Sequence, residues 1–517
     1  MLKKNSTNQL KIGVFLSYLQ IGLNMIVQLA YTPIMIRLLG KSEYGLYNLV
    51  GSVVSYLSLF SMGFTGAYLR FSTIKRKSGD RNEIASFNGM FLSLFLVMGV
   101  VALLCGGVLS LHCNTILGTN LTEQELSTAR VLMVILVINI ALTFPSSVFN
   151  SMITAEEQFL FQKLVTIIGT ILNPLIVLPL LIEGKGSVAV VLVTTCITFL
   201  QLIVNIYYCI FRLKTPIRFR NYDWKILKEM GIFSFFLFLN MIIDQINWTV
   251  DKLILGNVIG TKAVAEYGVG AQINTMTISF STAISSVFSP RINKIAVYSE
   301  NREKNFDELF IKVGRIQFMI LALITSGFVF FGKYFVQNIY AGKEYVDSYY
   351  VALLLIIPGV VPLIQNIGIE IQRAVNKHYF RSIIYFFMAF VNVVISIFLA
   401  KRWGTIGAAT GTAISLLVMN GLVMNLYYAK GIGLDICRFW KNIGKLLLSI
   451  CIPLLLGSIL NRTVKRLGIL PYLGLIMLYT IVYCLFLYRY GMNDYEKGII
   501  RNIIRKLRGK RKIEGSR

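Results

Sequence analysis

The sequence predicts an all-α polytopic membrane protein with about fourteen transmembrane helices. Of its 517 residues, 56% are hydrophobic and 15% are charged, and the mean hydropathy is +0.68. These values are too apolar for a soluble globular chain. Apolar stretches of about 20 residues, the length that crosses a bilayer, also recur along the whole sequence. No hydrophilic insertion between them reaches the size of a folded domain, so nearly all of the chain is expected to lie in the membrane.

Each expected helix is a segment of spanning length that charged or turn-forming residues delimit. In order, the segments lie near residues 12–38, 44–69, 84–110, 126–152, 159–182, 187–211, 230–257, 263–289, 309–335, 346–372, 379–400, 405–428, 441–460 and 468–488. The first follows MLKKNSTNQLK without a small-residue cleavage site, so it is expected to be retained as a helix and not removed as a signal peptide.

Basic residues are distributed unevenly between alternate connections of this helix array. With a cytoplasmic amino terminus, the cytoplasmic segments hold 38 Lys and Arg and the outward segments hold 13, which together make the 51 in the chain. This asymmetry is the positive-inside bias, and it predicts that both termini are cytoplasmic. The net charge of +27 therefore gives no reason to expect a nucleic-acid partner. The basic tail RNIIRKLRGKRK is expected to lie against anionic headgroups of membrane lipids.

Several residue types give no sign of a cofactor or metal site. The seven cysteines stand singly in or beside apolar segments, and His112 and His378 lie near predicted helix ends. The GKS at 40–42 lacks the glycine that a phosphate-binding loop needs, because Met35 stands in that position. We expect no cofactor.

An internal repeat relates the two halves of the chain at a constant offset of 220 residues. The matched pairs include Gly184 with Gly404, Asn205 with Asn425, Tyr207 and Tyr208 with Tyr427 and Tyr428, Gln20 with Asn240, Asn24 with Asp244, Gln28 with Trp248, and Gly40 with Gly260. The EYG that follows, at 43–45 and 266–268, has slipped by three residues. One register over two six-helix blocks indicates a duplication.

The duplication predicts the domain organisation. Since six is an even number, both copies enter the membrane from the same side, which makes them parallel repeats about an axis along the membrane normal. We expect an N-lobe at 1–215 and a C-lobe at 216–430 around a central cavity. Helices 13 and 14 at 431–490 fall outside the repeat, and 491–517 forms a basic cytoplasmic tail.

Polar side chains follow one face of the first and seventh helices. In the seventh, LNMIIDQINWTVDKLILG at 239–256, helical spacing places them on one stripe. The candidate pathway residues of the two stripes are Asn240, Asp244, Asn247, Trp248 and Asp251 on the seventh helix, and Gln20, Asn24, Gln28 and Tyr31 on the first. Because an ionisable group in the bilayer costs roughly 2.5–3.5 kcal/mol, such groups normally face a watery cavity. We expect a wet cleft between the two lobes.

A second interpretation of the aspartates stays open. Asp244 and Asp251 can instead join neighbouring helices through hydrogen bonds, with Lys252 available for a salt bridge. On the cleft hypothesis a carboxylate exchanges its charge with H+ or Na+ during the cycle, which couples transport to an ion gradient. Both aspartates should then matter for transport more than for folding.

Two segments at matching places in the repeat carry a resemblance to a known family. YTPIMIRLLGKSEYGLYNL, at the end of the first helix, and VDKLILGNVIGTKAVAEYGVG, in the second half, resemble the polysaccharide transporter family. Its members are the Wzx-type flippases of the multidrug, oligosaccharidyl-lipid and polysaccharide exporter superfamily. The resemblance covers essentially the whole chain.

The resemblance implies a function and a location. It implies alternating access between two six-helix lobes in the bacterial cytoplasmic (inner) membrane. The implied substrate is an undecaprenyl-diphosphate-linked oligosaccharide, moved to the outer leaflet for O-antigen or capsule export, with polysaccharide polymerase and chain-length machinery as candidate partners. A diphosphate needs cationic contacts, for which the candidates near helix ends are Arg37, Arg70, Lys252 and Arg291. Each can equally be an interfacial residue whose charge reaches water.

Three other functions fit the sequence less well. A multidrug or cation antiporter of the same superfamily would normally have twelve helices, and a lipid II flippase would share fourteen but not the LLGKSEYGLY segment. A membrane polysaccharide polymerase would need catalytic side chains in a sizeable outward loop. The acidic pair Glu123 and Glu125 in such a loop is expected to belong instead to the first turn of the fourth helix, which Thr122 caps. We expect no enzyme.

Overall fold

The structure is a computed structural model of the whole chain. Described are residues 2–61, 64–78, 80–118, 120–375, 377, 379–464 and 468–502. Within helices, the side chains of 2–15, 70, 74, 76–78, 232–233, 236–237, 240 and 463–464 lie outside the description. The described part is helical and contains no strand, so the predicted fold class is confirmed.

The structure divides into two compact units, each of which draws on more than one stretch of the sequence. Unit 1 comprises Met1–Gly268 and Val393–Ala408, and unit 2 comprises Val269–Asn392 and Ala409–Arg517. The lobe boundaries expected from the repeat, at 215 and 430, stay a prediction.

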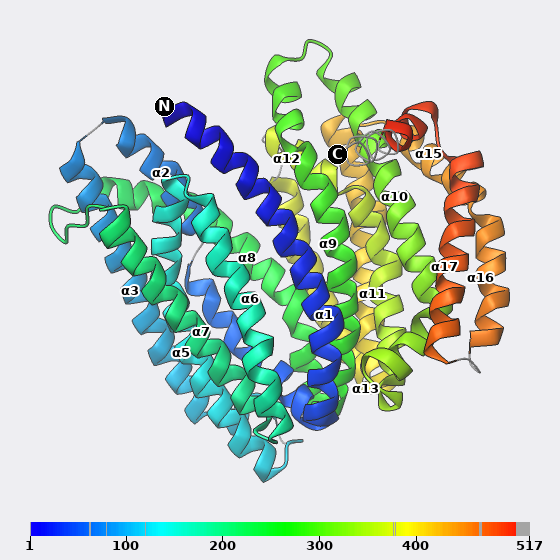
Figure 1. Cartoon of the computed structure of the whole chain (residues 1–517), viewed down its shortest axis with the longest axis horizontal. Coiled ribbons are helices and arrows are strands. Elements are labelled where there is room, and N and C mark those ends of the chain that lie inside the picture. Colours follow the sequence, from blue (N-terminus) through cyan, green and yellow to red (C-terminus); the bar gives the residue numbers. More distant parts are fainter. Residues whose placement is uncertain are drawn as a thin grey trace, which may run out of the picture. The chain divides into compact units, whose positions relative to one another are not determined.

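Unit 1 contains the helices of the first half of the repeat and the seventh helix. Its elements are α1 (Leu2–Ser55), a 3-10 helix (Tyr56–Ser61), α2 (Phe64–Ser78), α3 (Arg81–Leu111), α4 (Cys113–Leu117), α5 (Glu123–Ala155), α6 (Phe159–Ile182), α7 (Gly186–Tyr207), a π-helix (Tyr208–Arg212), α8 (Trp224–Val258), the start of α9 (Thr261–Tyr298) and the middle of α13 (Tyr379–Leu416). Helix α5 packs against α3 on one side and against α7 on the other (Figure 1). Buried rings join α3 to its neighbours: Tyr68 of α2 packs against Phe87 and Phe91, and Phe95 packs against Phe144 of α5.

Unit 2 contains the remaining helices. They are the rest of α9, α10 (Arg302–Tyr334), a π-helix (Phe335–Tyr340), a 3-10 helix (Lys343–Tyr345), α11 (Val346–Ile364), α12 (Asn366–Ala374), most of α13 (Tyr379–Leu416), a π-helix (Leu417–Val423), α14 (Met424–Tyr427), a π-helix (Tyr428–Ile432), α15 (Ile436–Ser449), α16 (Cys451–Val464), α17 (Ile469–Phe486) and a π-helix (Leu487–Gly491).

A row of buried tyrosines fixes α17 to α10. The hydroxyls of Tyr472 and Tyr483 donate to α10 backbone carbonyl oxygens at 3.1 and 2.9 Å, and Tyr479 donates to Ser326 Oγ at 2.7 Å. Each phenol therefore buries its ring and satisfies its hydroxyl. The helices predicted to lie outside the repeat are thus docked on the ninth predicted helix.

Every predicted segment corresponds to helix, but the number of membrane crossings stays a prediction. Among the described residues, nine helices are long and apolar enough to span a bilayer, or ten if one bent pair counts as a single span. Two of the nine continue through a turn and hold two predicted segments each. The segment predicted at 441–460 falls on a bent pair of helices: α15 begins at Ile436, and α16 is bent from it by 48° at Ile450. Whether the pair crosses the membrane as one span stays a prediction.

Glycines in left-handed conformation mark the same turns in both halves. Gly40 and Gly260 have φ of 75° and 118°, and Gly184 and Gly404 have φ of 78° and 60°. These are two of the pairs that the 220-residue offset matches, and φ values in this range favour glycine. The π-helices Tyr208–Arg212 and Tyr428–Ile432 also share the offset. The two halves therefore share backbone irregularities as well as sequence, as a duplication predicts.

Candidate functional site: a polar closure in unit 1

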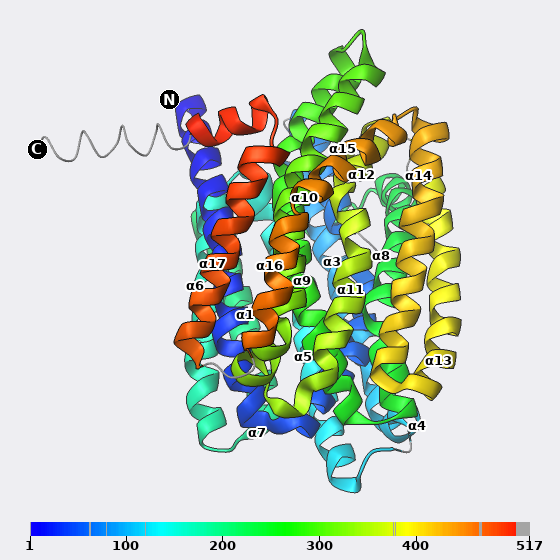
Figure 2. The same ribbon diagram turned by 90° about the vertical axis from the view of Figure 1, so that its right-hand side faces the viewer.

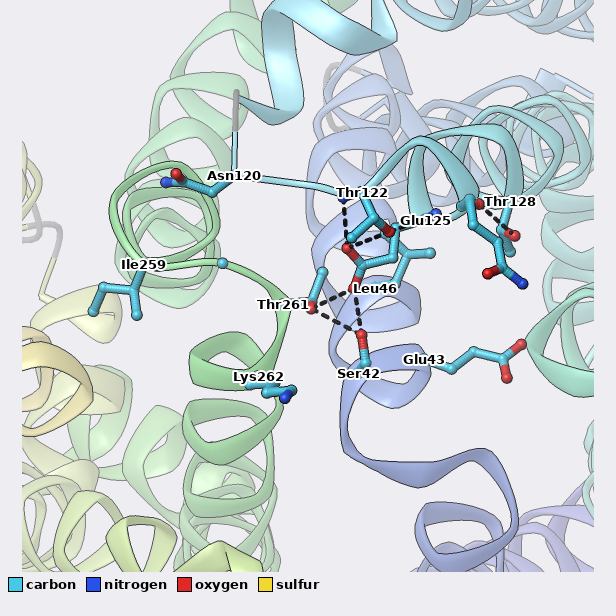
Figure 3. A pocket seen from close by; sticks show the side chains of 12 residues that line it. Ser42, Glu43, Leu46, Asn120, Thr122, Glu125, Thr128, Ile259, Thr261 and Lys262 are labelled. Atoms are coloured by element: carbon cyan, nitrogen blue, oxygen red, sulfur yellow. Dashed lines mark hydrogen bonds between the residues drawn. The ribbon is translucent and has the colours of Figure 1, made fainter.

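A cavity of about 570 Å³ opens at one end of unit 1, at the turns after Gly40 and Gly260 (Figure 3). Most of the residues that line it carry a hydroxyl, amide or charged group. The lining residues are Ser42, Glu43, Leu46, Asn120, Thr122, Gln124, Glu125, Thr128, Ile259, Gly260, Thr261 and Lys262. They come from α1, from the connection leading into α5, and from the α8–α9 turn. In the predicted topology this end faces outward.

The N-terminus of α5 forms one wall of the cavity. Thr122 accepts a hydrogen bond from the Glu125 amide, and the Glu125 carboxylate accepts one from the Thr122 amide at 2.9 Å, which is a complete capping box. The prediction that Thr122 caps this helix, with Glu123 and Glu125 in its first turn, is confirmed. Glu125 is thereby fixed in place with its second oxygen directed into the cavity.

That second oxygen joins three elements that are far apart in the sequence. Glu125 Oε1 accepts hydrogen bonds from Ser42 Oγ of α1 and, at 2.8 Å, from Thr261 Oγ1 of α9. The two hydroxyls also lie 3.1 Å apart. Figure 3 shows the three side chains converging. An ionised carboxylate makes stronger hydrogen bonds than a neutral acceptor, so Glu125 is the centre of this cluster.

An ion pair lies beside the cluster. Lys41 Nζ is 2.5 Å from Glu266 Oε1, and both side chains are largely buried. The other oxygen of Glu266 accepts a hydrogen bond from Thr405 Oγ1 at 3.1 Å. We call the five residues Lys41, Ser42, Glu125, Thr261 and Glu266 the polar closure.

The glutamates of the two EYG segments have the same role. Glu43 accepts hydrogen bonds from the Ser187 amide and hydroxyl at 2.6 and 2.8 Å, just beyond the left-handed Gly184. Glu266 binds Thr405, just beyond the left-handed Gly404. In each half, the motif glutamate therefore joins one left-handed turn to another.

The first EYG glycine permits a close approach of two backbones. A Cβ atom at Gly45 would lie 1.9 Å from the Thr261 carbonyl oxygen, much closer than any real contact. The second EYG glycine, Gly268, lies against the side chain of Asn48. Glycine at position 45 is thus what lets α1 approach Thr261 and complete the polar closure.

The predicted stripe on α8 is exposed at some positions and buried at one. Asp244 and Trp248 are exposed, and Asn247 is half-buried. Asp251 is only 2% exposed, and its Oδ2 accepts a hydrogen bond from Tyr267 at 2.5 Å. This contact favours the interpretation that Asp251 joins neighbouring helices, with Tyr267 as its partner instead of the predicted Lys252. The side chain of Asn240 lies outside the description.

The predicted stripe on α1 meets a lysine that the sequence analysis missed. Lys163 of α6 donates to Gln20 Oε1 at 3.2 Å, and its side chain is half-buried. Asn24, Gln28 and Tyr31 are half-buried as well. Lys163 stands inside an apolar segment, and its charge there was the only sign in the sequence that it could have a functional role.

The four predicted cations lie on four helices, α1, α2, α8 and α9. Lys252 donates to Asn48 Oδ1 at 3.4 Å. Arg37 is exposed on α1 in unit 1, and Arg291 is exposed on α9 in unit 2. The side chain of Arg70 lies outside the description. Their role in binding substrate stays a prediction.

The polar closure itself was not predicted, although its parts carry sequence signals. Thr-x-x-Glu at 122–125 indicates a capped helix, and the repeated EYG indicates that Glu43 and Glu266 have equivalent roles. Nothing in the sequence indicates that Glu125 meets Ser42 and Thr261. That contact depends on the packing of α5 against both turns.

The fold and the closure define a class: a multi-pass helical membrane protein with the architecture of the flippases and multidrug transporters. A lipid II flippase MurJ structure in an inward closed conformation matches with a TM-score of 0.71, covering 92% of this chain and 97% of the other at 15% identity. An inward-facing multidrug resistance MATE family transporter of the MOP superfamily matches at 0.64, covering 82% and 98% at 13% identity.

The family is shown by sequence. The model of the polysaccharide biosynthesis protein family matches residues 10–296, and the chain belongs to this family. A Shigella flexneri protein named "Putative O-antigen transporter" is 22% identical over 412 residues, which cover 78% of this chain and 93% of that protein. The resemblance inferred from LLGKSEYG and its second-half counterpart is confirmed.

Proposed function

We propose that this protein moves a lipid-linked oligosaccharide, carried on undecaprenyl diphosphate, from the inner to the outer leaflet of the bacterial cytoplasmic membrane for export of a surface polysaccharide. Membership of the polysaccharide biosynthesis family supports this proposal, as does the similarity to a protein named as an O-antigen transporter. The polymerase and chain-length machinery would receive the product.

The observation that carries the mechanism is the chemistry of the polar closure. Its contacts are hydrogen bonds and one ion pair, in which α1 and α5 meet residues of the second half of the repeat. A hydrogen bond to a charged group contributes a net free energy of about 1.5–3 kcal/mol, because both groups bind water when the contact opens. Such a seam can open and close in each cycle, as alternating access requires.

The route and the driving force follow from the polar stripes. The exposed Asp244 offers a carboxylate for exchange of H+ or Na+, and the Lys163–Gln20 pair adds a cation that can meet a diphosphate. Coupling requires that the ion binds one access state more tightly than the other.

The test is rescue of a strain that lacks its oligosaccharide flippase but makes the lipid-linked precursor. Expression of this chain should restore surface polymer and deplete the accumulated precursor. A strain depleted of its lipid II flippase and a strain without drug exporters, challenged with cationic dyes, serve as comparisons. Rescue of either comparison strain without restoration of surface polymer would overturn the proposal in favour of the corresponding alternative.

A further inference from the structure

Helix α15 is amphipathic, with a buried apolar face and an exposed basic face. Phe439, Ile443 and Leu446 are buried in the core of unit 2. The exposed cations Arg438, Lys441 and Lys445 are spaced by three and four residues, which places them on one stripe.

The exposed side chains change character along this segment. After Lys445 come the exposed Leu447 and Leu448, the latter 74% exposed, and α16 continues with exposed Ile452, Leu455 and Ile459. Exposed aliphatic side chains in a membrane protein face hydrocarbon, whereas Lys and Arg stay at the headgroups. The boundary between headgroups and hydrocarbon therefore falls near Lys445. The 48° bend at Ile450 lets α15 run obliquely to α16 (Figure 2).

The end of α17 shows the same boundary. Exposed Met477, Ile481 and Leu485 give way to exposed Arg489 and Tyr490, a basic residue beside an aromatic one as at a membrane interface. Residues 494–502 then continue as a helix that carries Lys497.

A buried arginine holds the end of α17 and the basic part of α15 at the same height along α10. Arg315 of α10 donates to the carbonyl oxygens of Asn442 in α15, at 3.4 Å, and of Gly491, at 2.9 Å. It also forms a two-bond ion pair with Glu496 at 2.7 and 2.8 Å, in which both side chains are buried. One guanidinium therefore fixes α15 and the C-terminal segment to the same turn of α10.

We propose that the cations fixed in this way form a binding surface for anionic phospholipid headgroups. This basic platform consists of Arg438, Lys441, Lys445, Arg489 and Lys497. The acidic residues closest to it in the sequence are Asp435, Asp494 and Glu496. Asp435 is engaged as the N-cap of α15 through the Arg438 amide, and Glu496 is paired with the buried Arg315. Cations at headgroup depth, beside aliphatic side chains that enter hydrocarbon, fit phosphatidylglycerol or cardiolipin. The inference does not depend on which substrate is transported.

The test uses Trp440 of α15, whose indole donates to Asn425. The full chain is reconstituted in phosphatidylcholine vesicles that contain one-fifth phosphatidylglycerol. Two samples are compared: in one the phosphatidylcholine carries the bromine quencher, and in the other the phosphatidylglycerol carries it. The fluorescence of Trp440 is taken as the difference between the wild type and Trp440→Phe. Brominated phosphatidylglycerol should quench the Trp440 fluorescence by more than its mole fraction in the vesicle predicts. Because salt screens the attraction between charges, 1 M salt should reduce this excess quenching.

The variant Arg438→Gln, Lys441→Gln, Lys445→Gln should lose the excess. Lys185→Gln, Lys343→Gln, Lys401→Gln, which changes three exposed lysines on other connections, should keep it. Quenching in proportion to lipid composition in the wild type would overturn the proposal, and so would an excess that survives both salt and the first triple variant. If that variant fails to fold, two other results decide. The excess quenching of the wild type must fall with salt, and the variant Lys441→Arg, Lys445→Arg must retain the excess.

Discussion

Lys41 and Glu266 form an ion pair of 2.5 Å although 225 residues separate them in the sequence. The lysine follows the left-handed Gly40, and the glutamate belongs to the EYG after the left-handed Gly260. The pair thus joins the two copies of one turn.

Removing either charge of this pair should loosen the polar closure. Exposed pairs contribute about 0.2–1 kcal/mol, and this pair, at 16% and 14% exposure, should lie at or above the upper end. A double-mutant cycle of Lys41→Gln and Glu266→Gln, read by thermal unfolding of the purified protein, measures the coupling. The exposed pair Arg373–Glu370 is the control and should give a coupling near zero. Equal couplings for both pairs would contradict the prediction.

Gly45→Ala should disrupt the closure without any change of charge. The added Cβ would meet the Thr261 carbonyl oxygen, a backbone atom that cannot rotate away. Overpacking of this kind typically costs about 1–3 kcal/mol. Gly51→Ala, on the same helix with nothing within 4 Å of the added atom, is the matched control and should be neutral or slightly stabilising. Both variants are compared by thermal unfolding and by rescue of surface polymer.

Arg315→Ala should destabilise unit 2 severely. Removal of one partner from a buried ion pair costs about 3–5 kcal/mol because the other charge stays buried. Glu496→Ala should have a similar effect, whereas Arg373→Ala, at an exposed pair, should not. Protease sensitivity of the C-terminal segment is the measurement. An intact segment in Arg315→Ala would show that other contacts hold it.

The two aspartates of α8 should behave differently. Asp244→Asn should express and unfold as the wild type does but lose surface polymer, since this exposed side chain is a pathway candidate. Asp251→Asn should lower the unfolding temperature, and Tyr267→Phe should do the same, because the two share a buried hydrogen bond. Normal rescue by Asp244→Asn would exclude it from the transport route.

Reporter fusions test the topology. Fusions after Gly118 and after Lys343 should be outside, and fusions after Lys77 or Arg220 should be inside, as the distribution of basic residues predicts. The reverse pattern would invert both the proposed direction of transport and the side on which the basic platform lies.

Local signals in the sequence were enough to predict individual helices and turns. Residues 159–182 are helical over the predicted range because polar residues stand at both ends of an apolar segment. Gly40 and Gly260 were matched by the repeat, and the structure shows why glycine is needed there. The bend at Ile450 was missed because average apolarity over 441–460 hides the basic stripe of α15.

Contacts between distant elements could not be predicted in the same way. The burial of Asp251 depends on Tyr267 from the next helix, and the role of Glu125 depends on hydroxyls 83 and 136 residues away. Helical periodicity tells which residues share a face but not which helix covers that face.

The one-sided ion pair of the EYG glutamates shows how far the two copies have departed from a symmetric pair. Two identical six-helix subunits would associate as a homodimer about a two-fold axis, and every contact between them would be made twice. In this chain, Glu43 and Glu266 each bind a hydroxyl of their own half, on Ser187 and Thr405, but Glu266 also pairs with Lys41 of the other half. The second half has Val264 where the first has Lys41, two residues before the EYG glutamate, so the ion pair that Glu266 makes with Lys41 cannot be repeated for Glu43.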